Sequence, residues 1–167
     1  LILSSPLLGT FMAKIFAGEI PKILIPFRYV EKLCYRFSAI DSEKEMNWKE
    51  YSFALLVFNF FGFIFLMLIQ MTQNLLPLNP QKLPAVPWHL ALNTSISFMT
   101  NTNWQAYAGE TTMSYFTQML GLGVQNFVSA ATGIAVFLAL ARGFSQKSKH
   151  EIGNFWVDIT RSVLYLF

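Results

Sequence analysis

Residues 51–76 have the sequence YSFALLVFNFFGFIFLMLIQMTQNLL, which contains no charged side chain in 26 positions. At ~1.5 Å of rise per residue, a helix of this length reaches ~39 Å, enough to cross a bilayer with some tilt. The scarcity of charge extends further, because residues 51–141 hold only two charged residues, Lys82 and Glu110. Apolar tracts of this length and low charge predict membrane-spanning helices.

The composition of the whole chain agrees with this prediction. Of the 167 residues, 54% are hydrophobic and only 13% are charged, against about 25% charged residues in soluble domains. The net charge of +3 comes from basic residues gathered where loops would flank a bilayer, so it does not indicate a nucleic-acid partner. Cys34 is the only cysteine, and it cannot form an internal disulfide.

These patterns predict an all-α, polytopic membrane protein with four parts. The first two are a leading transmembrane helix at residues 1–18 and a loop with an amphipathic helix at residues 19–50. The third, residues 51–141, comprises a span at 51–76, a short helix at 88–100, a polar loop at 100–109 and a second span at 112–141. The fourth, residues 142–167, is a basic loop and the start of another unit. Because the chain begins and stops inside apolar runs, we expect it to be a fragment of a longer membrane protein.

The amphipathic helix in the first loop has two possible roles. Its apolar face holds Tyr29, Val30, Leu33, Cys34 and Phe37, and its other face holds Arg28, Lys32 and Arg36. A helix of this kind either lies on a membrane surface or packs on its own protein, and we favour the second interpretation.

The distribution of lysine and arginine predicts the sidedness of the chain. Eleven of the twelve lie in residues 14–50 and 142–161, and only Lys82 lies between the two spans. The positive-inside rule places both basic segments in the cytoplasm. A short helix at 88–100, at ~20 Å, cannot cross a hydrocarbon core of ~30 Å. The stretch between the spans is therefore predicted to enter and leave the membrane on the outer side, as a re-entrant pore loop.

The order span, short helix, polar loop, span is the arrangement used by potassium channels. The C-terminal end of the short helix would favour a cation, and the following carbonyls would replace its hydration shell. The candidate ligands are the main-chain carbonyls of Thr100, Asn101, Thr102 and Asn103. The loop has no glycine before Gly109, so Asn101 and Asn103 are the residues expected to adopt positive φ. The alternative is an exposed turn whose side chains cap the neighbouring helices.

Several motifs carry a resemblance to a known family. They are LNPQ at 78–81, WHLALNT at 88–94, SFMTNTNWQ at 97–105, GETTMSYFTQM at 109–119, VQNF at 124–127, AATGIAV at 130–136 and GNFWVDITR at 153–161. Together they resemble the potassium-binding, channel-like A subunit of the Kdp-type potassium-transporting ATPase. That subunit has a leading helix and four membrane–pore–membrane repeats around one filter, so the resemblance implies that this chain holds about a quarter of the filter.

The resemblance also implies a function and partners. Potassium would be selected from outside by residues 100–103, with Gln105 just above them, and pumped inward without an organic cofactor. A separate catalytic subunit of the P-type ATPase kind would hydrolyse ATP, and small accessory subunits would complete the complex. The chain would then be no enzyme by itself, and it would reside in the inner membrane of a bacterial or archaeal cell.

Two rival functions stay open from the residues alone. A non-conducting scaffold or assembly subunit would need no ion at residues 100–103. An intramembrane enzyme would need a nucleophile–base pair or a metal set within the spans, and His89 and His150 both lie outside them. Four polar residues inside the spans either line an ion path or form hydrogen bonds between helices, which we favour for each: Asn59, Gln70, Gln125 and Asn126.

Overall fold

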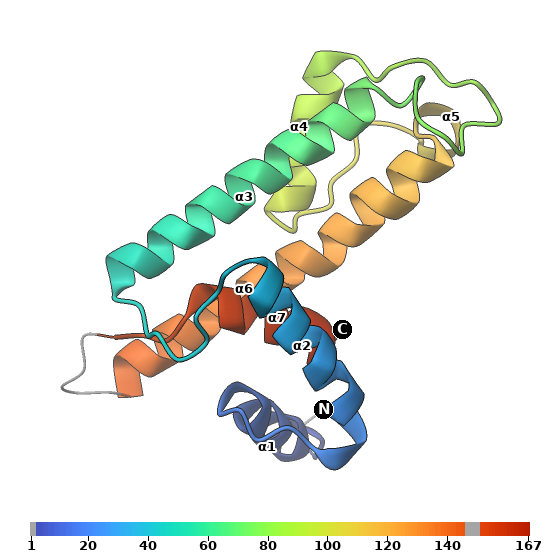
Figure 1. The fold of residues 1–167 in the computed structure, drawn as a ribbon. Helices are drawn as coiled ribbons and strands as arrows, with labels where there is room; N and C mark the ends of the chain where they lie inside the picture. Colours follow the sequence, from blue (N-terminus) through green and yellow to red (C-terminus); the bar gives the residue numbers. More distant parts are fainter. Residues whose placement is uncertain (1–2, 146–150) are drawn as a thin grey trace. The chain divides into compact units, whose positions relative to one another are not determined.

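The computed structural model describes residues 3–145 and 151–167, and their regular elements are helices (Figure 1). In chain order they are α1 (Ser5–Phe16), the 3₁₀ helix η1 (Lys22–Leu24), α2 (Ile25–Phe37), α3 (Trp48–Met71), α4 (Trp88–Met99), α5 (Gly109–Thr112), the π-helix η2 (Thr117–Gly123), α6 (Val124–Ser145) and α7 (Phe155–Tyr165). Three residues used in the arguments above, Lys147, Lys149 and His150, lie outside the described residues.

Two of the helical stretches are long and apolar enough to cross a membrane. The first is α3, with 24 residues, and the second is the continuous stretch of η2 and α6, Thr117–Ser145, with 29 residues. Both have high mean hydropathy, and in the apolar part of each only 17% and 22% of the residues, respectively, are buried. Apolar side chains exposed along a whole helix are stable against lipid rather than water.

The first span is shifted toward the N-terminus relative to the expected 51–76. It begins at Trp48 because Asn47 caps it: the Asn47 Oδ1 accepts hydrogen bonds from the backbone N–H groups of Lys49 (2.9 Å) and Glu50 (3.1 Å). The Glu50 carboxylate returns a bond by accepting from the Asn47 N–H at 3.0 Å, which completes a capping box. It ends at Met71, after which the chain tightens into turns such as Leu75 N–H to the Thr72 carbonyl at 2.9 Å.

The second span also differs from the expected 112–141. The chain is extended at Met113, which separates α5 from the helix that follows. Ser114 then starts the new helix, because its Oγ accepts a hydrogen bond from the Thr117 N–H at 3.2 Å. The helix continues to Ser145 rather than stopping at 141.

The leading helix α1 covers 12 of the residues expected to form a helix at 1–18. It ends at Phe16, and Gly18 follows with a φ of 85°. The Glu19 N–H bonds back to the Lys14 carbonyl at 2.8 Å across this turn. A residue in this conformation just after a helix is most often glycine, which has no Cβ to clash.

The chain divides into two compact units, and each has its own interior. One unit consists of Leu55–Thr132. Its apolar core is formed by Leu66, Val86, Ala91, Phe98, Met113 and Leu122, which come from α3, α4, η2 and the segments that join them. This unit contains the whole of the polar loop.

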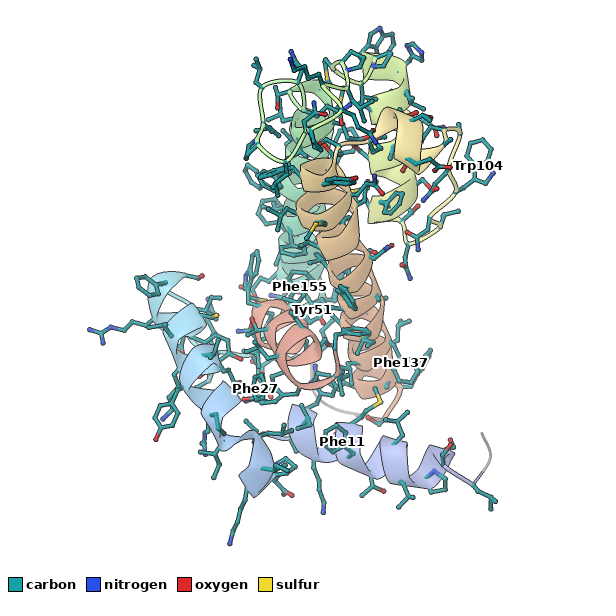
Figure 2. The ribbon with its side chains drawn as sticks, turned by 90° about the vertical axis from the view of Figure 1, so that its right-hand side faces the viewer. Phe11, Phe27, Tyr51, Trp104, Phe137 and Phe155 are labelled. Atoms are coloured by element: carbon teal, nitrogen blue, oxygen red, sulfur yellow. The ribbon has the colours of Figure 1, made fainter. Side chains whose placement is uncertain are left out.

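The other unit consists of Leu1–Ala54 and Gly133–Phe167. Here α2 lies beside α7 (Figures 1 and 2), so the amphipathic helix packs on its own protein. It does so through the side that carries the buried Glu31 and Tyr35, whereas the expected apolar face remains exposed. The rings of Tyr51 and Phe155 meet edge to face, with their centroids 5.5 Å apart (Figure 2). Arg142 forms a bidentate ion pair with the buried Asp158, in which its two terminal nitrogens donate to Oδ2 at 2.6 Å and to Oδ1 at 2.9 Å. These contacts tie the start of α3 and the end of α6 to α7.

Candidate cation site

The short helix α4 is anchored to α3 by Gln70, whose side chain is fully buried. Its Nε2 donates a hydrogen bond to Ser95 Oγ on α4 at 2.9 Å, and the main-chain carbonyl of Gln70 accepts one from the Val86 N–H at 3.1 Å. The expected hydrogen bonding between helices is therefore confirmed for Gln70. The position of α4 sets where the polar loop begins.

A second buried glutamine, Gln73, joins the segments on both sides of the loop. Its Nε2 donates to the carbonyls of Pro84 (2.6 Å) and Thr112 (2.8 Å). Its Oε1 accepts from the Ser114 N–H (3.0 Å) and from Thr117 Oγ1 (3.1 Å). One side chain thus fixes the segment before α4 and the segment after α5. This role was not predicted from the sequence, where its only signal is a second amide near the end of an apolar helix.

Ser97, in the last turn of α4, shapes the loop itself. Its carbonyl accepts hydrogen bonds from the N–H groups of Thr102 (2.9 Å) and Asn103 (3.1 Å). Its hydroxyl donates to the Trp104 carbonyl at 2.8 Å. The ring of Trp104 is exposed and projects outward (Figure 2). A single buried serine therefore folds residues 102–104 back against the end of the helix.

Asn101 and Asn103 both have a φ of 56°. This left-handed conformation was expected at these two positions, and the structure confirms it. Asparagine reaches it at lower cost than most residues with a Cβ. Because φ is positive at Asn101 and Asn103 but not at Thr102, the backbone of the loop between α4 and α5 is irregular.

Residues 100–103 are exposed, and their main-chain carbonyls accept no hydrogen bond from any residue that the structure describes. The next carbonyl, that of Trp104, differs because Ser97 occupies it. The four follow directly after the C-terminal end of α4, where the helix dipole places partial negative charge. Neutral carbonyl oxygens with free lone pairs can bind a cation at a site that contains no carboxylate.

The side chains of the loop behave in part as the alternative interpretation expects. Thr100 Oγ1 donates to the Ile96 carbonyl at 2.9 Å and so caps the end of α4. It also lies 3.0 Å from Thr102 Oγ1. These bonds use hydroxyl groups and leave the carbonyls of residues 100–103 free. Capping and cation binding therefore involve different atoms and are compatible.

Gln105 lies beside a pocket of about 220 Å³ next to the loop. The pocket is lined by Phe98, Asn103, Gln105, Tyr107, Gly109, Gln118, Leu122, Gly123 and Asn126. Two buried atoms on these residues, the Tyr107 hydroxyl and the Asn126 Oδ1, have no hydrogen-bond partner among the described residues. Burial raises the pKa of Tyr107 to about 12, so the phenol stays neutral. The neighbourhood of the loop is thus polar and uncharged.

The chemistry available at this site is that of neutral oxygen ligands. Residues 100–109 contain no acidic side chain. Among residues 3–145 and 151–167, no group of three or more histidine, cysteine or acidic residues is placed to hold a metal ion. A cation held by dipoles alone can be released again, which suits a monovalent ion in a transport path.

The other polar residues of the spans have separate roles. The Asn59 Nδ2 donates to the Leu55 carbonyl within its own helix at 2.8 Å. Gln125 is buried, with its Oε1 beside Gly62 of α3. Neither touches the loop in the structure. Asn126, by contrast, lines the pocket beside Gln105.

The fold and the site define an all-helical membrane protein with a polar loop held between a short helix and a second span. The family model described as the potassium-transporting ATPase A subunit matches residues 1–167. The chain therefore belongs to that family.

Curated relatives carry a more specific name. A protein from Hydrogenobaculum sp. (strain Y04AAS1) is 54% identical over 166 residues, which cover 99% of this chain. A protein from Geobacter sulfurreducens is 56% identical over 162 residues, or 95% of this chain, and one from Pseudomonas syringae pv. tomato is 53% identical over 165 residues. Each is named the potassium-binding subunit of a potassium-transporting ATPase. The chain spans 27–29% of the length of these relatives.

Proposed function

We propose that this chain forms one wall of the potassium filter in the potassium-binding subunit of an ATP-driven uptake pump. The main-chain carbonyls of Thr100, Asn101, Thr102 and Asn103 are the proposed ligands, and Gln105 lies at the mouth of the filter. Three further repeats of the full-length subunit would supply the other walls. The observation that carries the proposal is that these four exposed residues follow the end of α4 and that their carbonyls accept no hydrogen bond from the described residues.

The names of the relatives, each a subunit of a potassium-transporting ATPase, support the presence of other subunits beside this one. ATP hydrolysis is assigned to a separate catalytic subunit of the P-type, and small accessory subunits are expected beside it. The proposed location is the inner membrane of a bacterial or archaeal cell. The basic segments at 14–50 and 142–161 face the cytoplasm in this proposal, and the loop opens toward the outside.

A fixed positive charge at Gln105 tests the filter. Coulomb repulsion between unit charges ~4 Å apart is about 4 kcal/mol at an effective dielectric constant of 20. If water and side-chain rotation remove half, the remaining ~2 kcal/mol weakens affinity more than tenfold. We expect Gln105→Arg in the complete complex to raise the potassium concentration for half-maximal ATPase activity by that factor.

The matched control is Gln81→Arg, because Gln81 is exposed in the proline-rich segment before α4. It adds the same charge away from the loop and should change the potassium dependence little. A Gln105→Arg complex that assembles normally and has the potassium dependence of the wild type would contradict the proposal. In that case the scaffold function, in which residues 100–103 form a capped turn, becomes the better explanation.

A further inference from the structure

The surface of α2 is divided lengthwise into three sectors. Glu31 and Tyr35 form the buried sector, which faces α7. The Glu31 carboxylate accepts hydrogen bonds from Arg161 Nε at 2.8 Å and from the Tyr165 hydroxyl at 2.7 Å. These contacts fix the rotation of α2 about its own axis. They therefore determine which side chains face away from the protein.

The second sector is basic and exposed. Arg28, Lys32 and Arg36 follow one another at intervals of four residues and so share one side of the helix. None of the three forms an ion pair with a residue that the structure describes. Three aligned cations without an ion-pair partner in the described part of the chain form a surface that favours an anionic ligand.

The third sector is apolar and exposed, and it adjoins the basic one. Tyr29, Leu33 and Phe37 also recur at intervals of four, and they are 74%, 52% and 83% exposed. At ~100° per residue, each apolar side chain lies one step around the helix from its basic neighbour. Large side chains exposed in a continuous stripe indicate a surface that is covered by something other than water.

A surface pocket lies where the two exposed sectors begin. It has a volume of about 260 Å³ and is lined by Ile25, Arg28, Tyr29 and Lys32. Its walls therefore combine two cations with two apolar side chains. A phosphate group attached to an acyl chain has this same combination of charge and apolar surface.

The connections of α2 keep it close to the bilayer. Residues 17–24 join it to α1, and residues 38–47 join it to α3, which is long and apolar enough to span a membrane. Even fully extended, chain segments of eight and ten residues span at most ~3.6 Å per residue. An amphipathic helix tethered in this way can lie along the interface between lipid and water.

We propose that α2 lies on the membrane surface and binds anionic phospholipids. Tyr29, Leu33 and Phe37 enter the boundary between headgroups and acyl chains, and Arg28, Lys32 and Arg36 bind the lipid phosphates. Packing on α7 and contact with lipid use different sectors of the helix, so both occur together. The proposal does not depend on where potassium binds.

The test uses the full-length protein in its complete complex, with Cys34 and any other cysteine replaced. Leu33→Cys carries an environment-sensitive fluorophore. Glu43→Cys, at an exposed position in the loop that follows α2, carries the same label as control. Both complexes are placed in nanodiscs of phosphatidylcholine with roughly 30% of the anionic lipid phosphatidylglycerol. In one set of nanodiscs the phosphatidylcholine bears a nitroxide near the headgroup, and in the other set the phosphatidylglycerol bears it. Quenching reports contact between the label and that lipid.

We expect strong quenching at position 33, weak quenching at position 43, and greater quenching by nitroxide phosphatidylglycerol than by nitroxide phosphatidylcholine. Each cation near an anionic surface is worth about fivefold in lipid partitioning. The triple variant Arg28→Gln, Lys32→Gln, Arg36→Gln should therefore lose most of the preference for phosphatidylglycerol, and high salt should reduce it in the wild type.

Two results would overturn the proposal. Absence of quenching at position 33 would mean that protein covers the apolar sector, from the rest of the subunit or from another subunit. Equal quenching by the two lipids, unchanged in the triple variant, would mean that the three cations do not bind lipid phosphates.

Discussion

The hydroxyl of Ser129 donates a hydrogen bond to the Asn101 Oδ1 over 3.2 Å. This bond links α6 to the loop at a residue whose φ is positive. The same Oδ1 lies 3.4 Å from the Asn103 Nδ2, so one oxygen connects the second span to both left-handed asparagines. The conformation of the loop therefore depends on α6 as well as on α4.

Removing this hydroxyl should weaken potassium binding without preventing assembly. Ser129→Ala deletes the hydroxyl that bonds to the Asn101 Oδ1 and that also lies 3.2 Å from the Asn126 carbonyl. The bond to the loop is worth about 1 kcal/mol. We expect the potassium concentration for half-maximal ATPase activity of the complete complex to rise by up to about fivefold.

Thr132→Val is the matched control, because Thr132 is also buried in α6. Among the described residues, its hydroxyl bonds only to the Val128 carbonyl of the same helix. It should leave the potassium dependence close to that of the wild type. An equal effect of Ser129→Ala and Thr132→Val would show that the loop is insensitive to the Ser129 bond.

Substitutions at Asn103 separate backbone ligands from side-chain ligands. Glycine adopts a φ of 56° without strain and keeps the carbonyl, so Asn103→Gly should retain potassium binding within about threefold of the wild type. A β-branched residue in this conformation costs at least about 1–2 kcal/mol. Asn103→Val should therefore lower potassium affinity by roughly five- to thirtyfold.

The measurement is the potassium dependence of ATPase activity in complexes of equal subunit content. If Asn103→Gly loses as much affinity as Asn103→Val, the asparagine side chain rather than its carbonyl binds the ion. The positive φ makes this comparison informative here, because at an extended residue glycine and valine would both preserve the carbonyl position.

Gln73 should be a residue on which the stability of the repeat depends. Gln73→Leu keeps the approximate volume but removes bonds to Pro84, Thr112, Ser114 and Thr117. Each buried partner left without a hydrogen bond costs about 1–3 kcal/mol. We expect a marked fall in the temperature at which the purified complex unfolds, and a low yield. Gln81→Leu, at an exposed position, should change neither quantity.

The structure follows the sequence where local physics decides. The helix α4, Trp88–Met99, lies where a short helix of residues 88–100 was expected, and the two asparagines have the expected φ. The start of α3 at Trp48 could also have been predicted from the sequence, because Asn47 and Glu50 have the spacing of a capping box.

The roles of Ser97 and Gln73 could not be predicted from the sequence in the same way. Gln73 bonds to Thr117, 44 positions along the chain, and nothing in a single sequence identifies that partner. Ser97 acts mainly through its carbonyl, which every residue has. The starts of the two spans differ from the expected ones for a related reason. Hydrogen bonds to the side chains of Asn47 and Ser114 determine where each helix begins, and hydropathy averaged over a window does not detect such bonds.

The attachment of α2 to α7 should depend on the charge of Glu31. Burial alone raises the pKa of Glu31, but hydrogen bonds from Arg161, Tyr165 and Tyr35 outweigh burial and hold the pKa below its ordinary value of 4.5. A carboxyl whose folded pKa is depressed stabilises the fold above its unfolded pKa and loses that contribution as pH falls through the folded value. The protection of α2 amides against hydrogen exchange, corrected for the intrinsic rate, should therefore be constant above about pH 5 and decline as the pH falls below 4.5.

Glu31→Gln removes the charge at every pH and leaves Arg161 partly buried without its ion pair. Breaking a buried pair costs about 3–5 kcal/mol, and the partial exposure of Arg161 reduces that to about 2 kcal/mol. In the complete complex at pH 7, α2 amides that exchange by local opening should then exchange about thirtyfold faster than in the wild type. Glu43→Gln, at an exposed position in the following loop, removes the same charge and should leave α2 unchanged. If the exchange of α2 in Glu31→Gln equals that of the wild type, contacts other than the ion pair hold the helix on α7.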